Sequence, residues 1–274
     1  MVDQPSVAIV SVSYNCRAEI DACLQSIATN EPAFAARICV VDNGSSDGTP
    51  ELVRERWPMV QLIEPGANLG FSRGNNAGIR ATTSDLVLLL NPDTLVPRRA
   101  ISMLVARLTS DARIAAVGPR LVDGDGRPEL SFGWTMSPLG ELRQKTLSGL
   151  YQRQFGYAVR RVEQWTQEPG PREWLSGACL LVRRDDLEAA GLFDERFFMY
   201  TEDVDLCASL RALGKTIVFV PDAQVTHLRG RSASRNPQTE RLRRQSQLAY
   251  YAKHHPRWVP LLEFYLRVTG KRIL

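Results

Sequence analysis

The stretch LLLNPDTLV, residues 88–96, places the polar triplet Asn91-Pro92-Asp93 directly after an apolar run typical of a buried strand. A parallel strand that is buried on both faces has a nearly continuous hydrophobic sequence. In an open parallel sheet, ligands bind outside the carboxyl ends of the strands. The triplet can therefore carry functional side chains. It can also be an ordinary loop in which Pro92 ends the strand and Asp93 or Thr94 starts the next turn.

Apolar strands alternate with helices on both sides of this stretch. Residues 7–14 form a β-branched run, and residues 17–30 carry apolar side chains at helical spacing. This alternation predicts an α/β fold with a mostly parallel, Rossmann-like sheet and helices on both of its faces. The other expected strands are 37–42, 60–65, 85–93, 114–122, 174–184 and 216–221, and the other expected helices are 51–57, 72–83, 98–108 and the second half of 194–214.

One long segment interrupts the alternation. Residues 123–173 contain Gly, Pro and scattered aromatic residues without clear periodicity, so the sequence predicts an irregular region. Segments of this length inside a compact domain are usually functional or mobile.

The composition is that of an ordinary globular protein. The 274 residues are 44% hydrophobic and 23% charged, and they contain no run near the ~20 apolar residues that a membrane span needs. The N-terminus does not have the pattern of a signal peptide, which predicts a cytoplasmic protein. The five cysteines are widely spaced among mostly apolar neighbours, so we expect reduced core residues and no zinc site.

The positive charge is concentrated at the C-terminus. Residues 227–274 contain eleven Lys or Arg and two acids, a local charge of +9, whereas residues 1–226 carry −5. An acidic body argues against a nucleic-acid partner. The basic segment also contains Trp258, Leu261 and Phe264, a composition that suits an anionic membrane surface. A homodimer interface or a cap packed on the domain explains the same pattern.

A second acid, Asp42, closes the expected strand 37–42. If this strand neighbours the strand that ends at Asp93, both carboxylates face one crevice. The sequence around Asp42, DNGSSDG, is also a strong turn signal by itself, because Asn-Gly and Asp-Gly dipeptides favour turns.

Seven motifs in order resemble those of the family-2 glycosyltransferases, the inverting enzymes with the GT-A fold, and most closely their rhamnosyltransferase-like members. They lie within residues 7–232 and read VSYN, VVDNGSSDGT, NLGFSRGNNAGI, LLLNPDT, WLSGACLLVRR, GLFDERFFMYTEDVDLCASLRALG and HLRGRS. The resemblance implies a transferase domain at 1–232, with a nucleotide-sugar half at 1–122 and an acceptor and catalytic half at 123–232. Residues 233–274 would then form a basic, amphipathic helical extension.

The resemblance implies transfer of a sugar, with rhamnose as the candidate, from a dTDP- or UDP-sugar to a saccharide or a polyprenyl-linked glycolipid. Such a reaction belongs to the synthesis of cell-surface polysaccharide or glycolipid, at the inner face of the cell membrane. Asp93 matches the last Asp of the family's D-x-D signature, and His227 matches a family histidine, so the two would bind Mg²⁺ or Mn²⁺. Asn91 departs from the signature, because an amide contributes no charge to a metal site.

The residues that the resemblance assigns to the donor share positions at strand ends, at a helix start or beside the sugar pocket. They are Ser13, Tyr14, Asn15, Asp42, Asn43, Gly70, Arg73, Asn75, Asn91, Asp93, Trp174 and Gly177. The alternatives to donor binding are a solvated helix start for Arg73 and Asn75, and a core position for Trp174.

The motif TED, residues 201–203, supplies the candidate catalytic pair. Thr201 can cap a helix that has Glu202 and Asp203 in its first turn, where the helix dipole stabilises acids by ~0.3–1 kcal/mol. That stabilisation alone could explain the two acids. The resemblance implies instead that Asp203 is the general base and that Glu202 orients the substrate.

Two rival functions belong to other classes. A sugar-1-phosphate nucleotidyltransferase would share the nucleotide-binding half, but residues 13–20, SYNCRAEI, do not resemble its glycine-rich loop. A binding-only protein with a degenerate site is favoured only by Asn91.

Overall fold

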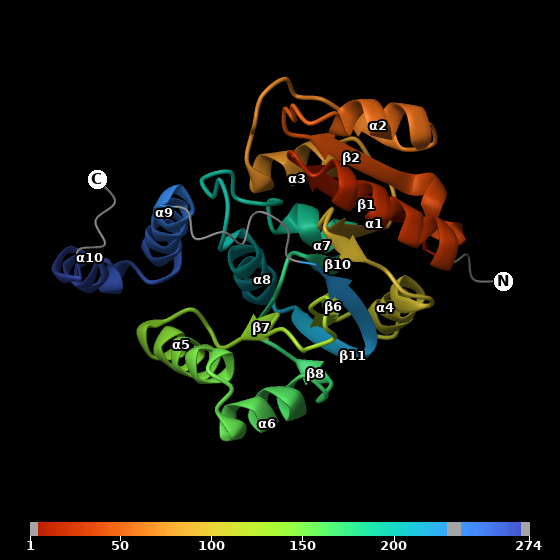
Figure 1. Cartoon of the computed structure of the whole chain (residues 1–274). Coiled ribbons are helices and arrows are strands. Elements are labelled where there is room, and N and C mark those ends of the chain that lie inside the picture. The colour runs from red at the N-terminus through yellow and green to blue at the C-terminus, as the bar shows by residue number, and fades with distance from the viewer. Residues whose placement is uncertain (1–4, 229–236, 270–274) are drawn as a thin grey trace.

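The computed structural model describes residues 5–228 and 237–269 (Figure 1). The N-terminal half contains β1 (Val7–Ser13), α1 (Arg17–Asn30), the 3₁₀ helix η1 (Pro32–Arg37), β2 (Ile38–Asp42), α2 (Thr49–Arg56), β3 (Gln61–Ile63), α3 (Phe71–Arg80), β4 (Leu86–Leu90), β5 (Thr94–Leu95), α4 (Ala100–Thr109) and β6 (Ile114–Val122). The remainder contains β7 (Phe132–Gly133), α5 (Pro138–Gln152), α6 (Gly156–Trp165), β8 (Gly170–Pro171), β9 (Trp174–Leu175), β10 (Cys179–Arg183), α7 (Arg184–Ala189), α8 (Glu202–Ala212), β11 (Thr216–His227), α9 (Pro237–His254), the 3₁₀ helix η3 (Pro256–Trp258) and α10 (Val259–Val268).

The main sheet has the strand order β3-β2-β1-β4-β10-β6-β11-β5, and β8 pairs with β11. The first four strands are parallel, as the alternation of strands and helices predicts. Strand β10 lies antiparallel between β4 and β6. Because Cys179 at the start of β10 pairs with Leu90 at the end of β4, the loop before β10 lies at the carboxyl end of the sheet. Strand β1 separates β2 from β4, so the strands that lead to Asp42 and Asp93 are not neighbours.

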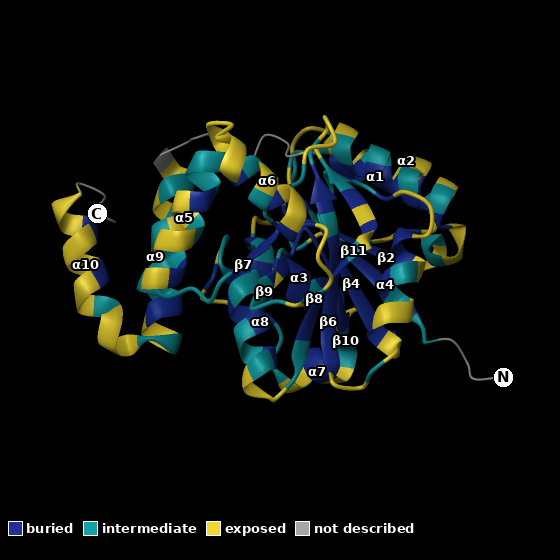
Figure 2. Cartoon of the chain, turned by 90° about the horizontal axis from the view of Figure 1, so that it is seen from below, coloured by how far each residue is buried: buried dark blue, intermediate teal, exposed yellow. Residues whose placement is uncertain are grey.

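Helices cover both faces of the sheet, because its strands are apolar on both sides. In β4, Leu86, Leu88 and Leu90 pack in one core cluster, and Val87 and Leu89 pack in a second. Helices α1, α2 and α4 contribute to the first cluster, and α3, α6, α7 and α8 contribute to the second. The strands are accordingly buried throughout the centre of the molecule (Figure 2).

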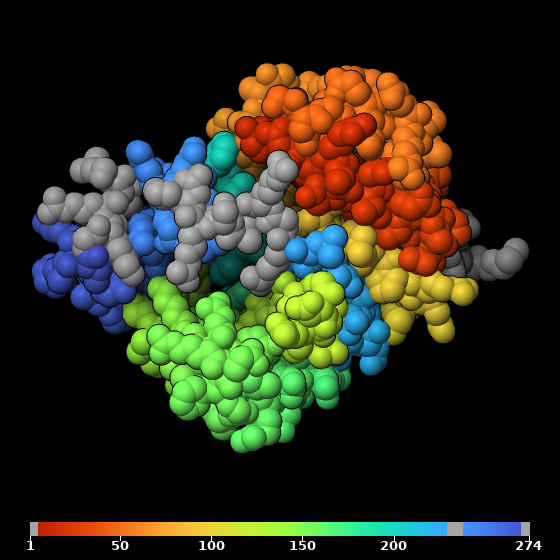
Figure 3. Space-filling view, in the orientation of Figure 1, coloured from red at the N-terminus to blue at the C-terminus, as the bar shows by residue number. Residues whose placement is uncertain are grey.

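The segment 123–173 is not irregular, as its sequence suggested, because it contains α5 and α6. Helix α5 buries only Gly140 and Leu147, too few positions to give its sequence a clear helical period. Helix α6 does bury Ala158, Val162 and Trp165 at helical spacing, but it spans only ten residues. The two helices pack together and contribute Leu147, Ala158, Val162 and Trp165 to the second core (Figure 1), and Figure 3 shows them, in green, forming one side of the molecule.

The described part of the C-terminal segment forms α9 and α10, which confirms its helical character. A third core cluster joins these helices to the chain that precedes α8, and its buried members include Phe197, Tyr250 and Leu266. Figure 1 shows α9 close to α8, with α10 further out. The predicted start of the extension at 233 lies outside the described residues.

Two simpler expectations concern cysteines and membrane spans. All five cysteines are free, and four of them are buried, which confirms the predicted reduced state. In residues 5–228 and 237–269, no helix is long and apolar enough to cross a membrane.

A buried ion pair ties α9 to the helix that carries the predicted catalytic acids. Asp205 in α8 is 2% exposed, and it accepts hydrogen bonds from Lys253 Nζ at 2.8 Å and His254 Nε2 at 2.6 Å. Lys253 also pairs with Asp194 at 3.0 Å. Removing one partner of a buried pair costs much more than losing a surface pair, because the other charge stays buried without compensation.

We therefore expect Asp205→Asn to loosen α9. Breaking a buried pair typically costs about 3–5 kcal/mol, and we expect about 2–3 kcal/mol here because Lys253 keeps Asp194. Urea unfolding should show this loss, and hydrogen exchange should show it concentrated in α9. Glu51→Gln, which removes an exposed pair with Arg54, is the control and should change stability by less than about 1 kcal/mol. Unchanged exchange in α9 would show that the pair does not hold the helix.

Candidate active site

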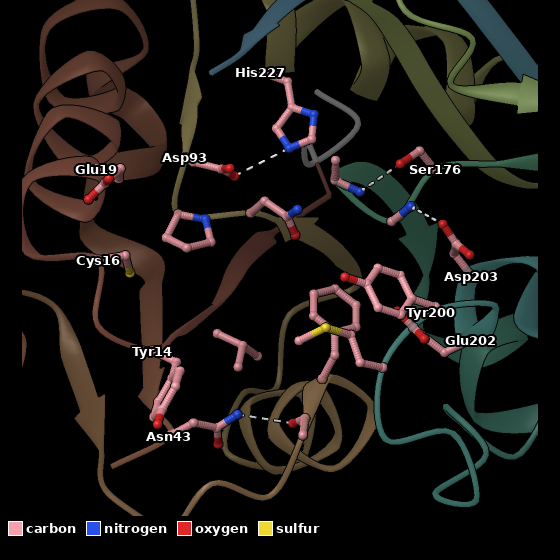
Figure 4. A pocket seen from close by; sticks show the side chains of 18 of the residues that line it. Tyr14, Cys16, Glu19, Asn43, Asp93, Ser176, Tyr200, Glu202, Asp203 and His227 are labelled. Atoms are coloured by element: carbon pink, nitrogen blue, oxygen red, sulfur yellow. Dashed lines mark hydrogen bonds and ion pairs between the residues drawn. The ribbon is translucent and has the colours of Figure 1, made fainter. Parts of the chain in front are cut away.

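A pocket of about 430 Å³ opens at the carboxyl end of the parallel strands. Its walls come from the chain after β1, β2 and β4, from the start of α3, from the loop before β10, from residues 199–203 and from His227 and Arg243. Figure 4 shows Asp93 and His227 on one side of this pocket, facing Glu202, Asp203 and Tyr200 on the other. The sequence motifs therefore converge on one site.

The ends of β1 and β2 form one wall of the pocket. Tyr14, half exposed, and Asn15 line it. Asn15 has a φ of +49°, and its carbonyl oxygen Oδ1 accepts a hydrogen bond from the Ser46 N–H at 2.8 Å. This wall is thus fixed by contacts between the chain after β1 and the loop after β2.

Asp42 does not line the pocket, because the loop after β2 closes over it. Its side chain is 1% exposed. Ser13 Oγ and Ser45 Oγ donate to Asp42 Oδ1 at 3.0 and 2.6 Å, and the Ser45 N–H donates to Oδ2 at 2.8 Å. The structure therefore gives Asp42 and Ser13 a role in holding the loop, and contact of Asp42 with the donor stays a prediction.

Asn43 and Gly70 connect this wall to the start of α3. Asn43 Nδ2 donates to the Gly70 carbonyl oxygen at 3.0 Å, and both residues line the pocket. Gly70 has a φ of +82°, and a Cβ there would collide with the carbonyl oxygen of Phe198. The Phe71 N–H donates to that same carbonyl at 2.7 Å. The glycine permits the chain before α8 to approach α3 closely.

Arg73 and Asn75, two predicted donor residues, do not line the pocket. Arg73 is half exposed and pairs with Glu195 at 3.4 Å. Asn75 is buried, and its Nδ2 donates to the carbonyl of Phe71 at 3.0 Å within α3. Their roles here are to anchor and stabilise the helix, and contact with a donor stays a prediction.

Trp174 also lies away from the pocket. It pairs with Gly133 in the small sheet of β7 and β9, and its Nε1 donates to the carbonyl of Trp134 at 3.0 Å. It packs against the second core, the alternative that its sequence left open. The predicted Gly177 does line the pocket, three residues further along the chain.

The end of β4 supplies Asn91 and Asp93. The Asn91 N–H donates to the carbonyl of Ala178 at 2.9 Å, and the Asn91 side-chain oxygen is buried without a hydrogen-bond partner. Asp93 Oδ1 lies 3.3 Å from His227 Nε2, because β11 pairs with β5 in a register that places His227 opposite Thr94. Residues 134 positions apart in the chain thus form one polar cluster.

Glu129 completes this cluster and was not singled out by the sequence. Its Oε2 lies 3.2 Å from His227 Nδ1, and the residue is buried. Burial lowers the pKa of His227, but hydrogen bonds to Asp93 and Glu129 outweigh that effect and raise it to about 9. The two carboxylates therefore favour the protonated form of His227.

The donor set around Asp93 fits a divalent cation, although no group of three metal-binding His, Cys, Asp or Glu side chains forms within residues 5–228 and 237–269. Asp93 Oδ1 and a deprotonated His227 Nε2 are close enough to share one ion. The unpartnered Asn91 oxygen is a neutral acceptor beside them in the pocket wall. Hard cations accept such oxygen ligands and complete their shell with phosphate oxygens and water.

The segment before α8 is strained. Tyr200 and Thr201 have φ values of +72° and +71°, a conformation that is costly for residues other than glycine. Thr201 occupies the N-cap position, as predicted, but its side chain makes no capping hydrogen bond. Strain of this kind persists only where surrounding contacts fix it, and such sites are often functional.

Glu202 and Asp203 begin α8 and line the pocket. Asp203 Oδ2 accepts a hydrogen bond from the Gly177 N–H at 2.9 Å, and Oδ1 accepts one from the Val204 N–H at 2.8 Å. Burial raises the pKa of Asp203, and these hydrogen bonds partly oppose the rise. Glu202 Oε2 is buried without a partner, and burial together with the charge of Asp203 raises the pKa of Glu202 well above its ordinary value.

Helix α9 contributes a pocket residue that the sequence did not reveal. Arg243 lines the pocket, and its guanidinium lies over the ring of Tyr200, 4.6 Å from the ring centroid. Forty residues separate Arg243 from Asp203, and no local motif marks it. Cys16 and Glu19 also line the pocket, from the start of α1.

The chain matches known proteins over most of its length. A family model described as "Glycosyltransferase like family 2" matches residues 5–260. An N-acetylglucosaminyl-diphospho-decaprenol L-rhamnosyltransferase of Mycobacterium tuberculosis is 33% identical over 264 residues, which cover 91% of this chain and 85% of that protein. A low-salt glycan biosynthesis hexosyltransferase of Haloferax volcanii is 27% identical over 218 residues, which cover 75% of this chain and 61% of that protein.

Solved structures of other transferases have the same fold. A mannosyltransferase from Pyrobaculum calidifontis, in complex with GDP-Man and Mn²⁺, aligns with a TM-score of 0.64 at 22% identity and covers 95% of this chain and 69% of its own. GalNAc-T7, with UDP, GalNAc and Mn²⁺, aligns with a TM-score of 0.63 at 16% identity and covers 90% of this chain and 48% of its own. This likeness confirms the predicted GT-A fold.

The family model spans almost all described residues, and the motifs of the sequence meet in one pocket that holds both a candidate metal site and a candidate base. The chain therefore belongs to glycosyltransferase family 2 and is a glycosyltransferase.

Proposed function

We propose that this protein is an inverting transferase that moves a sugar, with rhamnose as the candidate, from a dTDP- or UDP-sugar to a hydroxyl of a sugar carried on a polyprenyl diphosphate. The observation that carries the proposal is the arrangement of Asp93 and His227 across one pocket from Glu202 and Asp203. In inverting transfer the acceptor hydroxyl attacks C1 of the sugar from the side opposite the departing diphosphate. The groups that bind the diphosphate and the general base must therefore lie on opposite sides of the donor sugar. The Mycobacterium tuberculosis relative, named for rhamnosyl transfer to a diphospho-decaprenol substrate, supports the choice of sugar and acceptor.

The nucleotide would lie against Tyr14, Asn15 and Asn43, with its diphosphate toward Asp93. Asp93 and His227 would hold a Mn²⁺ or Mg²⁺ ion, which supplies positive charge to the leaving diphosphate. The Mn²⁺ in the two solved structures of the same fold supports this assignment. His227 must lose its proton to become a ligand, because an imidazolium has no free lone pair at Nε2.

Asp203 would take the proton of the acceptor hydroxyl as that oxygen attacks C1 of the donor sugar. Two backbone N–H groups fix its carboxylate, and each oxygen keeps lone-pair capacity to accept a proton. Glu202, with its strongly raised pKa, holds a proton more readily than Asp203 and suits a hydrogen-bond donor to substrate. Environments that push two carboxyl pKa values apart assign different roles to them.

The nucleotidyltransferase alternative does not agree with the family to which the chain belongs. An assay for free nucleoside diphosphate distinguishes a binding-only protein from the proposed enzyme. It measures release from dTDP- and UDP-sugars, with and without a polyprenyl-diphosphate-linked acceptor. Failure to release it from any donor would favour a binding-only protein.

Asp203→Asn should lower kcat by about 10²–10⁴-fold, the usual contribution of positioned proton transfer, and leave donor affinity unchanged. The substitution keeps the shape of the side chain and removes its basicity. Glu202→Gln is the matched comparison and should cost less, since an amide still donates a hydrogen bond. Steady-state kinetics and donor titration measure both effects. Near-normal turnover of Asp203→Asn together with an inactive Glu202→Gln would reverse the assignment.

Asp93→Ala should remove stimulation by Mn²⁺ or Mg²⁺ and nearly all transfer, because the metal would lose its charged oxygen ligand. The assay compares activity in added metal and in EDTA, with folding checked by circular dichroism. Asp125→Ala, which removes an exposed carboxylate that does not line the pocket, is the control. Wild-type activity that EDTA does not change would exclude the metal role.

We also propose that α10 contacts an anionic membrane surface. Its outer side exposes Leu261, Phe264, Tyr265 and Val268 at helical spacing, whereas Leu262 and Leu266 are buried toward α9. Figure 2 shows this outer side as largely exposed. The +9 charge of residues 227–274 complements anionic lipid, and such binding would bring the pocket to a lipid-linked acceptor.

The double variant Leu261→Ser/Phe264→Ser should sediment less with vesicles that contain anionic phospholipid, because the apolar contact is lost. Binding of the wild type should weaken with salt, since surface charges are screened over ~8 Å at physiological ionic strength. Leu142→Ser, an exposed leucine of α5, is the control. Unchanged vesicle binding together with a shift from dimer to monomer would identify the outer side of α10 as a homodimer interface instead.

A further inference from the structure

Arg243 is held at the pocket by a helix that is firmly attached to the catalytic segment. Ser246 Oγ, one turn further along α9, donates to the carbonyl of Met199 at 2.8 Å. Tyr250 packs in the third core with Phe197, and both are at most 1% exposed. Helix α9 is therefore built into the wall that carries Glu202 and Asp203, and the position of Arg243 is set by that packing.

The guanidinium of Arg243 keeps hydrogen-bonding capacity toward the pocket. It stacks on the ring of Tyr200, and this stacking uses one face of the guanidinium and none of its N–H donors. Its ion pair is with Glu240 at 3.6 Å, and Glu240 also binds Arg244 at 3.2 Å. The side chain is half exposed, so water solvates its remaining donors.

The pocket that Arg243 lines has more acidic than basic side chains among its described residues. Its described lining includes the carboxylates of Glu19, Asp93 and Asp203, and these charges would repel a substrate that carries phosphate. On the Asp93 side, His227 is already paired with two carboxylates. On the side of the candidate base, Arg243 is the cationic side chain among the described lining residues.

We propose that Arg243 binds the diphosphate that joins the acceptor sugar to its polyprenyl chain, and that α9 thereby selects diphosphate-linked acceptors. The inference rests on the proposed function. Tyr200, on which Arg243 stacks, lies beside Glu202 and Asp203 and opposite Asp93 and His227 (Figure 4). A cation on the base side is placed for the acceptor, whereas the donor diphosphate would lie across the pocket. Arginine suits this task because its planar fork matches phosphate oxygens.

The test compares two acceptors: N-acetylglucosamine linked through a diphosphate to farnesol, and the octyl glycoside of N-acetylglucosamine, which has no phosphate. Arg243→Ala should raise KM for the diphosphate acceptor by about 10–100-fold, the range that a charge-assisted hydrogen bond supports. KM for the octyl glycoside and for the donor should stay within about threefold. Arg243→Lys should recover part of the affinity, because it restores the charge without the fork. Arg241→Ala, an exposed arginine of the same helix, is the control for net charge.

Four outcomes overturn the inference. An equal rise in KM for both acceptors, or a loss of kcat alone, would show that Arg243 only supports Tyr200. A rise confined to the donor KM would place the donor diphosphate at Arg243. An unchanged KM for the diphosphate acceptor would show that Arg243 binds no phosphate. Failure of the proposed function is a different result, in which the wild type transfers sugar to neither acceptor and releases no nucleoside diphosphate.

Discussion

The hydrogen bond from the Gly177 N–H to Asp203 connects the two sides of the active site. One residue later, the carbonyl of Ala178 accepts the Asn91 N–H at the end of β4. A single short loop thus fixes the candidate base relative to the candidate metal ligand. A Cβ on Gly177 would lie 3.3 Å from the Cβ of Asp203, so a larger residue would press the two apart. Proximity of this kind is worth more in catalysis than the strength of either hydrogen bond, because reacting groups must meet in a narrow range of geometry.

The C-terminal helices belong to the same construction. The strained backbone at Tyr200 and Thr201 must be held by its surroundings, and α9 supplies a hydrogen bond to Met199, a ring contact to Tyr200 and an ion pair to Asp205. These contacts aim the start of α8 into the pocket. The segment that looked like an appendage in the sequence is therefore part of the pocket wall that carries Glu202 and Asp203.

The carboxylates of the site differ in environment in a way that separates their roles. Asp93 faces the ring of His227, Asp203 accepts two backbone N–H groups, and Glu202 is buried with one oxygen unpartnered. The first is prepared for positive charge, and the second keeps a fixed carboxylate whose pKa burial has raised. The third is costly to ionise, because burial and the charge of Asp203 raise its pKa. Asn91, which lacks charge, adds a buried acceptor beside Asp93 rather than a second anion.

The sequence by itself determined the parallel strands of the N-terminal half, the helices between them and the acids that terminate them. These features are local: apolar runs and helical spacing report burial of neighbouring residues, and the motifs report residues adjacent in the chain. It also determined the candidate metal ligands and the TED acids, through their motifs. The sequence did not predict helices α5 and α6. Helix α5 buries too few residues to give its sequence a helical period, and α6 spans only ten residues.

Only the tertiary structure decided which of these residues meet. The antiparallel insertion of β10 brings Gly177 to the end of β4, the pairing of β11 with β5 brings His227 to Asp93, and the docking of α9 brings Arg243 to Tyr200. The loop after β2 closes over Asp42, and the helix start keeps Arg73 and Asn75 out of the pocket. Each outcome depends on strand register and core packing, which are determined by many residues far apart in the chain. No short stretch of sequence therefore predicts them.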